Sequence, residues 1–339
     1  MASLLRRPPE PARLEIVGAA GVLTLAASAG DAAHFREILR IADRMSPRLR
    51  AAFIRTVEEL RAKIPEQRLA VAFESGRIEA VLETLALEDM GKMLLPRVSV
   101  PLARVTETVG EVATAALAKR IGAALEWGKL SRRARAWVKQ HGADLVKEVS
   151  DATREAIRET IRDVFGAQKL TTSQATRLIR QTVGLAPPQA KALSGFTAEL
   201  VDRGIPDKEI RRLAGIYERR LLRYRAENIA RTETVQAASA SQRELWAEGE
   251  AQGHWQRGEY VREWQAILRD GRICQECYEA HGQRAPLGKP YPNGTMGPTL
   301  HTRCRCGERL VEPDDPQPAK PPFVEPEDGG GLRPMLPKV

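Results

Sequence analysis

Apolar residues recur at every third or fourth position through most of the first two thirds of the chain, which is the period of an α-helix. From residue 31 to about residue 166 this pattern predicts one helix after another. Pro47 and Pro65 are each predicted to begin a new helix, because proline is favoured in a first helical turn. Pro96 and Pro101 predict a linker, followed by a further helix over 105–118.

Residues 167–250 have the most regular pattern. Thr171 and Thr172 are of the type that caps a helix N-terminus, and the Pro187-Pro188 pair predicts the start of the next helix. Gly204 is a typical helix stop. The pattern then predicts one long helix from Pro206 to about Gly249. A helix of more than about 25 residues is typical of an elongated assembly part and not of a compact enzyme.

The N-terminal stretch, residues 1–30, resembles a signal peptide because Arg6 and Arg7 precede an apolar run over 16–29. Glu15 and three prolines interrupt that arrangement, and the run is too short to span a bilayer. We therefore predict a buried helix or an apolar arm here and no transmembrane segment.

The last third predicts a different organisation. Residues 254–273 have strand character and predict a short hairpin, or a strand followed by a helix. From residue 313 the chain changes character: between Glu312 and Gly331 there are six acids against one lysine, with repeated prolines, and this predicts a solvated, disordered tail. The expected fold is mainly α: an elongated helical body with a small C-terminal α+β module, cross-linked by cysteines like a zinc knuckle. The expected divisions are an arm (1–30), two helical domains (31–166 and 167–250), a cysteine-rich module (251–312) and a tail (313–339).

All four cysteines lie in the module, as the pairs Cys274–Cys277 and Cys304–Cys306. Two such pairs can supply the four thiolates of a tetrahedral Zn²⁺ site and so stabilise a segment too short for a large core of its own. We predict zinc bound by these four cysteines, with His301 as the substitute for one of the last two. Two disulfides or free thiols are the alternatives. A redox C-x-x-C is disfavoured because no βαβ pattern surrounds it.

The chain carries a net charge of +9, which suits a protein that works near polyanions, although arginine-rich helices alone also produce it. Residues 119–139 concentrate seven basic residues against the single acid Glu126. Cations at this density can neutralise phosphates, and indoles can stack on bases. The candidate DNA contacts are Lys129, Arg132, Arg133, Arg135 and Trp137. The alternative is that the tryptophans belong to the core and the cations form a solvated face.

Several ordered segments resemble a known family. They are the phrase Ile229-Ala230-Arg231-Thr232-Glu233-Thr234, then Trp264, then Asp270-Gly271-Arg272-Ile273-Cys274 with Cys277, then Gly282, and finally Leu300-His301-Thr302-Arg303-Cys304-Arg305-Cys306. In order and spacing they resemble the phage head morphogenesis family, the minor head proteins similar to protein F of phage Mu. The resemblance covers roughly residues 165–311. Thr302 and the Pro298-Thr299-Leu300 stretch depart from the prolines usual in the family.

The resemblance implies a structural role without catalytic residues. Such a protein is a minor component of the prohead, made in the bacterial cytoplasm and located in the capsid interior. Its implied partners are the portal protein, the major capsid or scaffold proteins, and packaged DNA; neither a membrane nor a small-molecule substrate is expected.

Charged residues of the long helix are candidates for a structural ion pair. Glu227 and Arg231 are spaced to pair along the helix, and we expect Arg231 and Glu233 to fix how the helix docks on the cysteine-rich module.

The enzymatic alternative is a zinc-flanked, HNH-like metal-dependent nuclease. His281, Asn293 and His301 lie between the two cysteine pairs in the order that such enzymes use. The proline- and glycine-rich stretch 283–300 does not show the strand pattern that this site needs. An ADP-ribosyltransferase, suggested by Glu248 and Glu250, is disfavoured further because this region is predicted to be helical.

Overall fold

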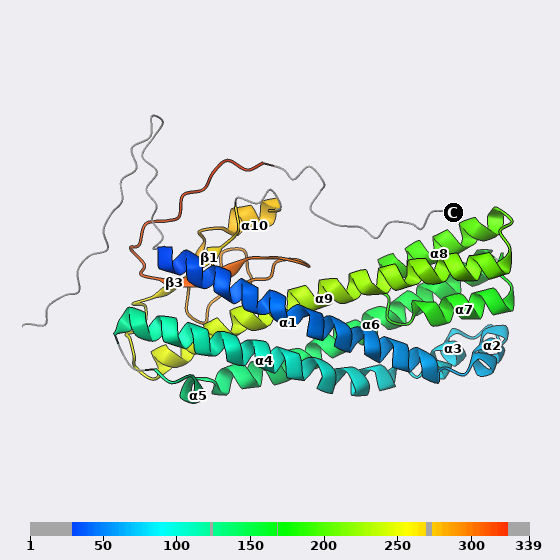
Figure 1. Cartoon of the computed structure of the whole chain (residues 1–339), viewed down its shortest axis with the longest axis horizontal. Coiled ribbons are helices and arrows are strands. Elements are labelled where there is room, and N and C mark those ends of the chain that lie inside the picture. Colours follow the sequence, from blue (N-terminus) through cyan, green and yellow to red (C-terminus); the bar gives the residue numbers. More distant parts are fainter. Residues whose placement is uncertain (1–28, 123–124, 168, 269–272, 325–339) are drawn as a thin grey trace, which may run out of the picture.

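Long helices make up most of the protein (Figure 1). The computed structural model describes residues 29–122, 125–167, 169–268 and 273–324 of the 339 in the chain. The helices are α1 (Ala29–Lys63), α2 (Glu66–Glu74), α3 (Ile78–Thr84), α4 (Glu88–Ile121), α5 (Trp127–Leu130), α6 (Arg132–Ala167), α7 (Thr172–Thr182), α8 (Pro187–Asp202), α9 (Asp207–Ala251) and α10 (Gln275–Ala280). The strands are β1 (Val261–Gln265), β2 (Arg284–Pro286) and β3 (Gly307–Val311). The predicted mainly α fold with a small C-terminal α+β module is confirmed.

The helical body is built around α1, α4, α6 and α9, which lie side by side along the long axis of the molecule (Figure 1). Their apolar faces meet in one core that includes Phe53, Leu102, Ile157 and Leu221, one from each helix. α2, α3, α7 and α8 lie at one end of this bundle and the sheet lies at the other. The core therefore joins residues from both predicted helical domains, 31–166 and 167–250.

Three prolines lie inside long helices, contrary to the sequence prediction. Pro47 is within α1, and Pro96 and Pro101 are within α4, so the expected helix start at Pro47 and the linker at 96–101 are wrong. A proline in a helix costs roughly 3 kcal/mol through the lost hydrogen bond and the steric clash. Burial of apolar residues on both sides, such as Val98 and Leu102, continues the helix through that local defect.

The predicted helix boundaries of the middle segment are confirmed. Thr171 is the N-cap of α7, and its side chain forms a capping box with Gln174. α8 begins at Pro187, and Gly204 has a φ of +67° just after its end. The long helix α9 runs from Asp207 to Ala251 and is the element that connects the body to the module.

The three strands form an antiparallel sheet in the order β2-β1-β3. Val261 pairs with Pro286 on one side and with Val311 on the other. β1 therefore joins segments that are distant in sequence and does not form a local hairpin; of the two predictions for 254–273, a strand followed by the helix α10 is confirmed. The sheet places the two cysteine pairs around one small core.

Most of residues 313–324 are exposed, as a solvated tail predicts, but Pro321 and Phe323 contact Tyr278 of α10. The Tyr278 hydroxyl donates a hydrogen bond to the Pro321 carbonyl oxygen over 2.6 Å, and the Phe323 ring lies 5.2 Å from the Tyr278 ring. Residues 325–339 and the predicted arm up to residue 28 lie outside the described residues. None of the helices described here is long and apolar enough to cross a membrane.

Candidate metal centre

The first cysteine pair is placed by the start of α10. Cys274 is the N-cap of this helix, and its sulfur accepts a hydrogen bond from the Cys277 backbone N–H at 3.4 Å. The C-x-x-C spacing thus brings both sulfurs to one end of the helix. Cys304 and Cys306 come from the segment that leads into β3.

Five side chains form two overlapping groups of metal-ligand atoms, each group within 4.8 Å. One group is Cys274, Cys277 and His301, and the other is Cys277, Cys304 and Cys306. The Cys277 sulfur is 3.6 Å from that of Cys304 and 3.1 Å from Nε2 of His301. The edge of a tetrahedron with Zn–S bonds of about 2.3 Å is about 3.8 Å, so the separation of the two sulfurs fits shared coordination. The structure therefore brings together all five predicted ligands, with Cys277 common to both groups.

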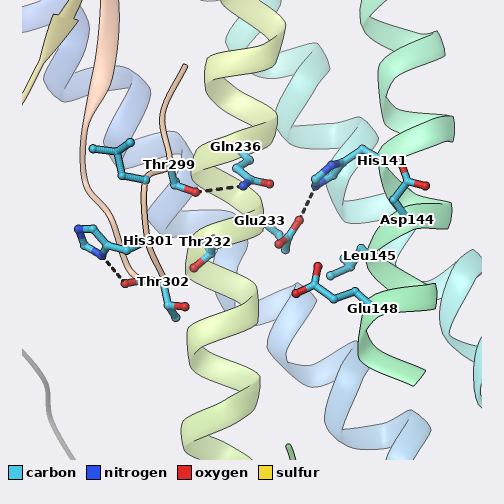
Figure 2. Close-up of a pocket in the computed structure, with 11 residues that line it drawn as sticks. His141, Asp144, Leu145, Glu148, Thr232, Glu233, Gln236, Thr299, His301 and Thr302 are labelled. Carbon is cyan, nitrogen blue, oxygen red and sulfur yellow. Dashed lines mark hydrogen bonds and ion pairs between the residues drawn. The ribbon is translucent and has the colours of Figure 1, made fainter. Parts of the chain in front are cut away.

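His301 is oriented as a metal ligand. Its Nδ1–H donates to the Thr302 carbonyl oxygen over 2.9 Å (Figure 2), which leaves Nε2 facing the sulfurs of Cys274 and Cys277, each 3.1 Å away. Metal-bound histidines commonly donate their second ring N–H in this way.

Burial makes the charge state of the sulfurs interdependent. Cys277, Cys304 and Cys306 are each at most 4% exposed, and all four cysteines are free thiols. Hydrogen bonds from the Cys277 and Cys306 thiols lower the pKa of Cys304 well below its usual range, and the hydrogen bond to Cys304 in turn raises the pKa of Cys277. One thiolate is thus stabilised at the expense of its neighbours, and a metal cation would stabilise several together.

One further feature fits a thiolate-bound metal. The indole N–H of Trp264 is buried without a nitrogen or oxygen acceptor, and it lies in the same small core as Cys306. A Cys306 thiolate would provide the missing acceptor. The cluster could therefore hold a metal ion.

A buried ionic network on the sheet holds the second cysteine pair in place. The Glu308 carboxylate accepts hydrogen bonds from Arg262 at 2.8 Å, Arg243 at 2.9 Å and the Tyr291 hydroxyl at 3.0 Å. Arg243 belongs to α9, so this network connects the module to the body. Sequence reasoning missed these residues because charged residues in a short strand are usually exposed.

The charged residues of the long helix pair with partners other than those predicted. Glu227 pairs with Arg50 of α1 at 2.7 Å, and Arg231 lies 3.8 Å from Asp43, which is also in α1.

Glu233 pairs with His141 of α6. The predicted Glu227–Arg231 and Arg231–Glu233 pairs are therefore wrong, because each of these side chains pairs instead with a residue of α1 or α6. Docking on the module instead uses Thr232, whose Oγ1 accepts a hydrogen bond from the Arg303 backbone N–H at 3.0 Å.

The basic segment is partly used in packing. Trp137 is half-buried against the main core and stacks on His141, with 4.3 Å between the ring centroids. This agrees with the alternative in which the tryptophans of this segment belong to the core. Arg133 pairs with Glu244 of α9 at 3.3 Å. Arg132, Arg133 and Arg135 are exposed, and the side chain of Lys129 lies outside the described residues. DNA contact by this segment stays a prediction.

The three residues of the nuclease alternative have separate contacts. Nδ1 of His281 accepts the Ala266 backbone N–H at 3.0 Å, and burial lowers the pKa of this imidazole to about 4. Oδ1 of Asn293 accepts hydrogen bonds from the backbone N–H and the hydroxyl of Thr295. His301 faces the cysteines.

Comparisons of the chain with protein-family models, with curated proteins and with solved structures give no match.

Proposed function

We propose that this protein is a minor head protein of a bacteriophage, a structural component of the prohead that acts in the capsid interior near the portal protein and packaged DNA. Its partners in this role are the portal protein and the major capsid or scaffold proteins. The metal of the C-terminal module is one structural zinc ion per chain, bound by Cys277 and three of the four donors Cys274, His301, Cys304 and Cys306.

The observation that supports this role most directly is the contact between Thr232 and Arg303. These residues belong to the two motifs that carry the resemblance to the head morphogenesis family, and they are 71 positions apart in the sequence. The Gln236 side chain also donates to the Thr299 hydroxyl at 3.0 Å. The motifs therefore form one structural unit, a long helix with a docked module, as a part with an assembly role requires.

Zinc is favoured by the donor set. Thiolates and imidazole suit Zn²⁺, whereas Mg²⁺ and Ca²⁺ require oxygen ligands. A closed set of protein ligands is typical of a structural zinc site, and a catalytic site keeps one position for water. The ion would stabilise a module whose own core is small.

The test is to purify proheads from cells that produce the phage encoding this chain and to probe them for this protein and the portal protein. The assembly role predicts that both sediment together and that the portal protein co-purifies with the tagged chain after the proheads are dissociated. If the tagged chain is absent from proheads at every stage of assembly, the proposed assembly role is wrong.

A nuclease assay separates the competing class. Purified protein would be incubated with plasmid DNA and Mg²⁺, Mn²⁺ or Zn²⁺, beside the His301→Ala variant. Cleavage by the wild type that the variant loses would replace the structural role with a catalytic one.

A further inference from the structure

A furrow of about 960 Å³ lies between α1 and α4, which run side by side in opposite directions (Figure 1). Its floor is apolar and consists of small or exposed side chains: Pro47, Ala51, Pro96, Val100 and Ala103. Val100 is 71% exposed, whereas the valines around it on α4 are buried in the core. An exposed apolar surface with a polar rim is typical of a contact with another protein.

Prolines are concentrated at this furrow. The three prolines that lie beyond the first turn of a described helix are Pro47, Pro96 and Pro101, and all three line the furrow. Each costs its helix about 3 kcal/mol because it removes an N–H and crowds the preceding turn. Natural proteins break such local rules mainly at functional sites. The prolines therefore indicate a function for this surface independently of its exposure.

The rim of the furrow has an excess of positive charge. Four arginines line it against two glutamates. Glu59 pairs with Arg97 at 2.7 Å, and Glu107 lies 3.7 Å from Arg104, so both acids already have an arginine partner. The other two arginines therefore provide the excess.

These two arginines, Arg48 and Arg55, are exposed residues of α1 and form no ion pair within the described chain. The Nε–H of Arg55 donates to the Ala51 carbonyl oxygen at 3.3 Å, which directs this side chain along its own helix. Arg48 and Arg55 are seven positions apart, which is two turns or about 10 Å along α1. Charge complementarity selects a partner with acidic residues at the same spacing.

The shape of the furrow identifies an α-helix as its occupant. From Pro47 to Glu59 the furrow follows α1 for about 18 Å, which is between three and four turns of a helix. A third helix packs its ridges between two helices, and the small side chains of Ala51 and Ala103 allow a close approach. An extended peptide would need partners for its backbone N–H and C=O groups, and prolines and residues within helices have few to offer.

We propose that this furrow binds an amphipathic helix of a partner protein, with an apolar stripe on Val100 and two acids seven positions apart on Arg48 and Arg55. Apolar anchors at every third or fourth residue provide the affinity in this kind of recognition, and the flanking charges set the orientation. The proposal goes beyond the assembly role and does not rest on it, because the chemistry of the ligand follows from the furrow alone.

The experiment begins with a displayed library of helical peptides of about four turns, selected on the full-length protein. Leucines form a fixed apolar stripe, and the flanking positions are randomised. The expected result is enrichment of acidic residues at two flanking positions seven apart. The parallel selection uses Val100→Glu, which places a charge in the floor and should enrich no such peptides. Equal enrichment on both proteins, or neutral or basic flanks, overturns the proposal.

Fluorescence anisotropy with one selected peptide then locates the contact. Val100→Glu should weaken binding by at least about tenfold, whereas Val71→Glu, the same change at a valine of α2 that is 68% exposed, should not. Arg48→Glu combined with Arg55→Glu should also weaken binding by at least about tenfold. Arg36→Glu, exposed on α1 about 18 Å before Arg48, is the control. All these positions are exposed, so we expect the variants to fold, and thermal unfolding checks this.

The charge-reversed protein tests the orientation of the helix. A peptide with lysines in place of its two acids should bind the protein carrying Arg48→Glu and Arg55→Glu about tenfold more tightly than it binds the wild type. Equal binding of this peptide to both proteins would show that the two arginines do not contact it, and the proposal would be wrong.

Two further measurements test other occupants. A wild-type dimer that Val100→Glu makes monomeric in sedimentation would assign the furrow to a second copy of this chain and overturn the proposal. A labelled DNA duplex whose binding is weakened by the changes at Arg48 and Arg55, but not by Val100→Glu, would assign the rim to nucleic acid and also overturn it. Failure of the chain to enter proheads would remove the assembly role and leave the peptide affinities unaffected.

Discussion

The backbone N–H of Arg303 donates a hydrogen bond to Oγ1 of Thr232 over 3.0 Å, and this contact links the cysteine-bearing loop to the longest helix of the body. The Arg303 guanidinium lies 5.7 Å from the centre of the Tyr224 ring, two helical turns away along α9. Arg303 has a φ of +66°, a conformation that non-glycine residues seldom adopt. Its backbone is thus held in this conformation where the module meets α9.

Replacing Thr232 with valine should loosen this junction. Valine has the same shape but no acceptor, so the Arg303 N–H loses its partner at a cost of about 1 kcal/mol in the free energy of unfolding. We expect that loss in urea denaturation, together with faster proteolysis of residues 299–306. Thr234→Val is the matched control, because the Thr234 hydroxyl donates within its own helix to the Ala230 carbonyl oxygen. Equal proteolysis of the module in both variants would contradict this role of Thr232.

The helices could be predicted from the sequence because their signal is local. Apolar spacing and the Thr171 cap predict the body, including the full extent of α9. The prolines misled the prediction because the penalty of Pro96 and Pro101 is local, whereas the burial that outweighs it depends on packing against other helices. No property of a single segment shows that packing.

The sequence predicted which residues supply the donor atoms of the metal centre, but not how these atoms are arranged. The spacing of four cysteines identified the cluster, but the shared position of Cys277 depends on how α10 meets the segment before β3. The partners of Glu233 and Arg231 were missed for the same reason. His141 comes from a helix some ninety residues earlier, and its sequence context gives no sign of this contact.

Metal analysis of single variants should distinguish the ligands. The wild type should contain about one zinc per chain, and Cys277→Ser should lose nearly all of it because both groups of donors share this sulfur. Five donors for four positions mean that one of the four variants Cys274→Ser, His301→Ala, Cys304→Ser and Cys306→Ser should keep most of its zinc. Plasma mass spectrometry with a thiol count gives both quantities.

The exposed His254→Ala serves as the control for an imidazole outside the cluster and should keep its zinc. Wild-type protein without zinc, or with two ions per chain, would contradict a single closed site.

Two helical glycines should respond to alanine in opposite directions. A Cβ at Gly249 would lie 2.2 Å from the Trp255 ring, so Gly249→Ala forces the end of α9 away from that indole and should cost about 1–3 kcal/mol. A Cβ at Gly195 of α8 meets nothing within 4 Å, so Gly195→Ala should stabilise the protein by roughly 0.5–1 kcal/mol. Thermal unfolding of both variants measures the difference. A stabilised Gly249→Ala variant would show that Trp255 does not pack against the helix as described.

The start of α9 should show a pH-dependent contribution from Asp207. A hydrogen bond from Arg177, with others from Arg211 and Gln174, lowers the pKa of Asp207 to about 2. A carboxylate whose pKa is lower in the folded state stabilises the fold fully above its unfolded value of roughly 3.9 and loses that contribution as the pH falls toward 2. Because the side chain is 43% exposed, solvent screening limits the effect.

Asp207→Asn should therefore lower the free energy of unfolding by roughly 0.5–1 kcal/mol at pH 7, and the difference from the wild type should shrink below pH 4. Urea denaturation of both proteins between pH 7 and pH 3 measures that difference, and acid loss of metal affects both proteins alike. Asp163→Asn, exposed on α6, should match the wild type at every pH. A difference at Asp207 that stays constant down to pH 3 would show that the aspartate acts through its shape at the helix start and not through its charge.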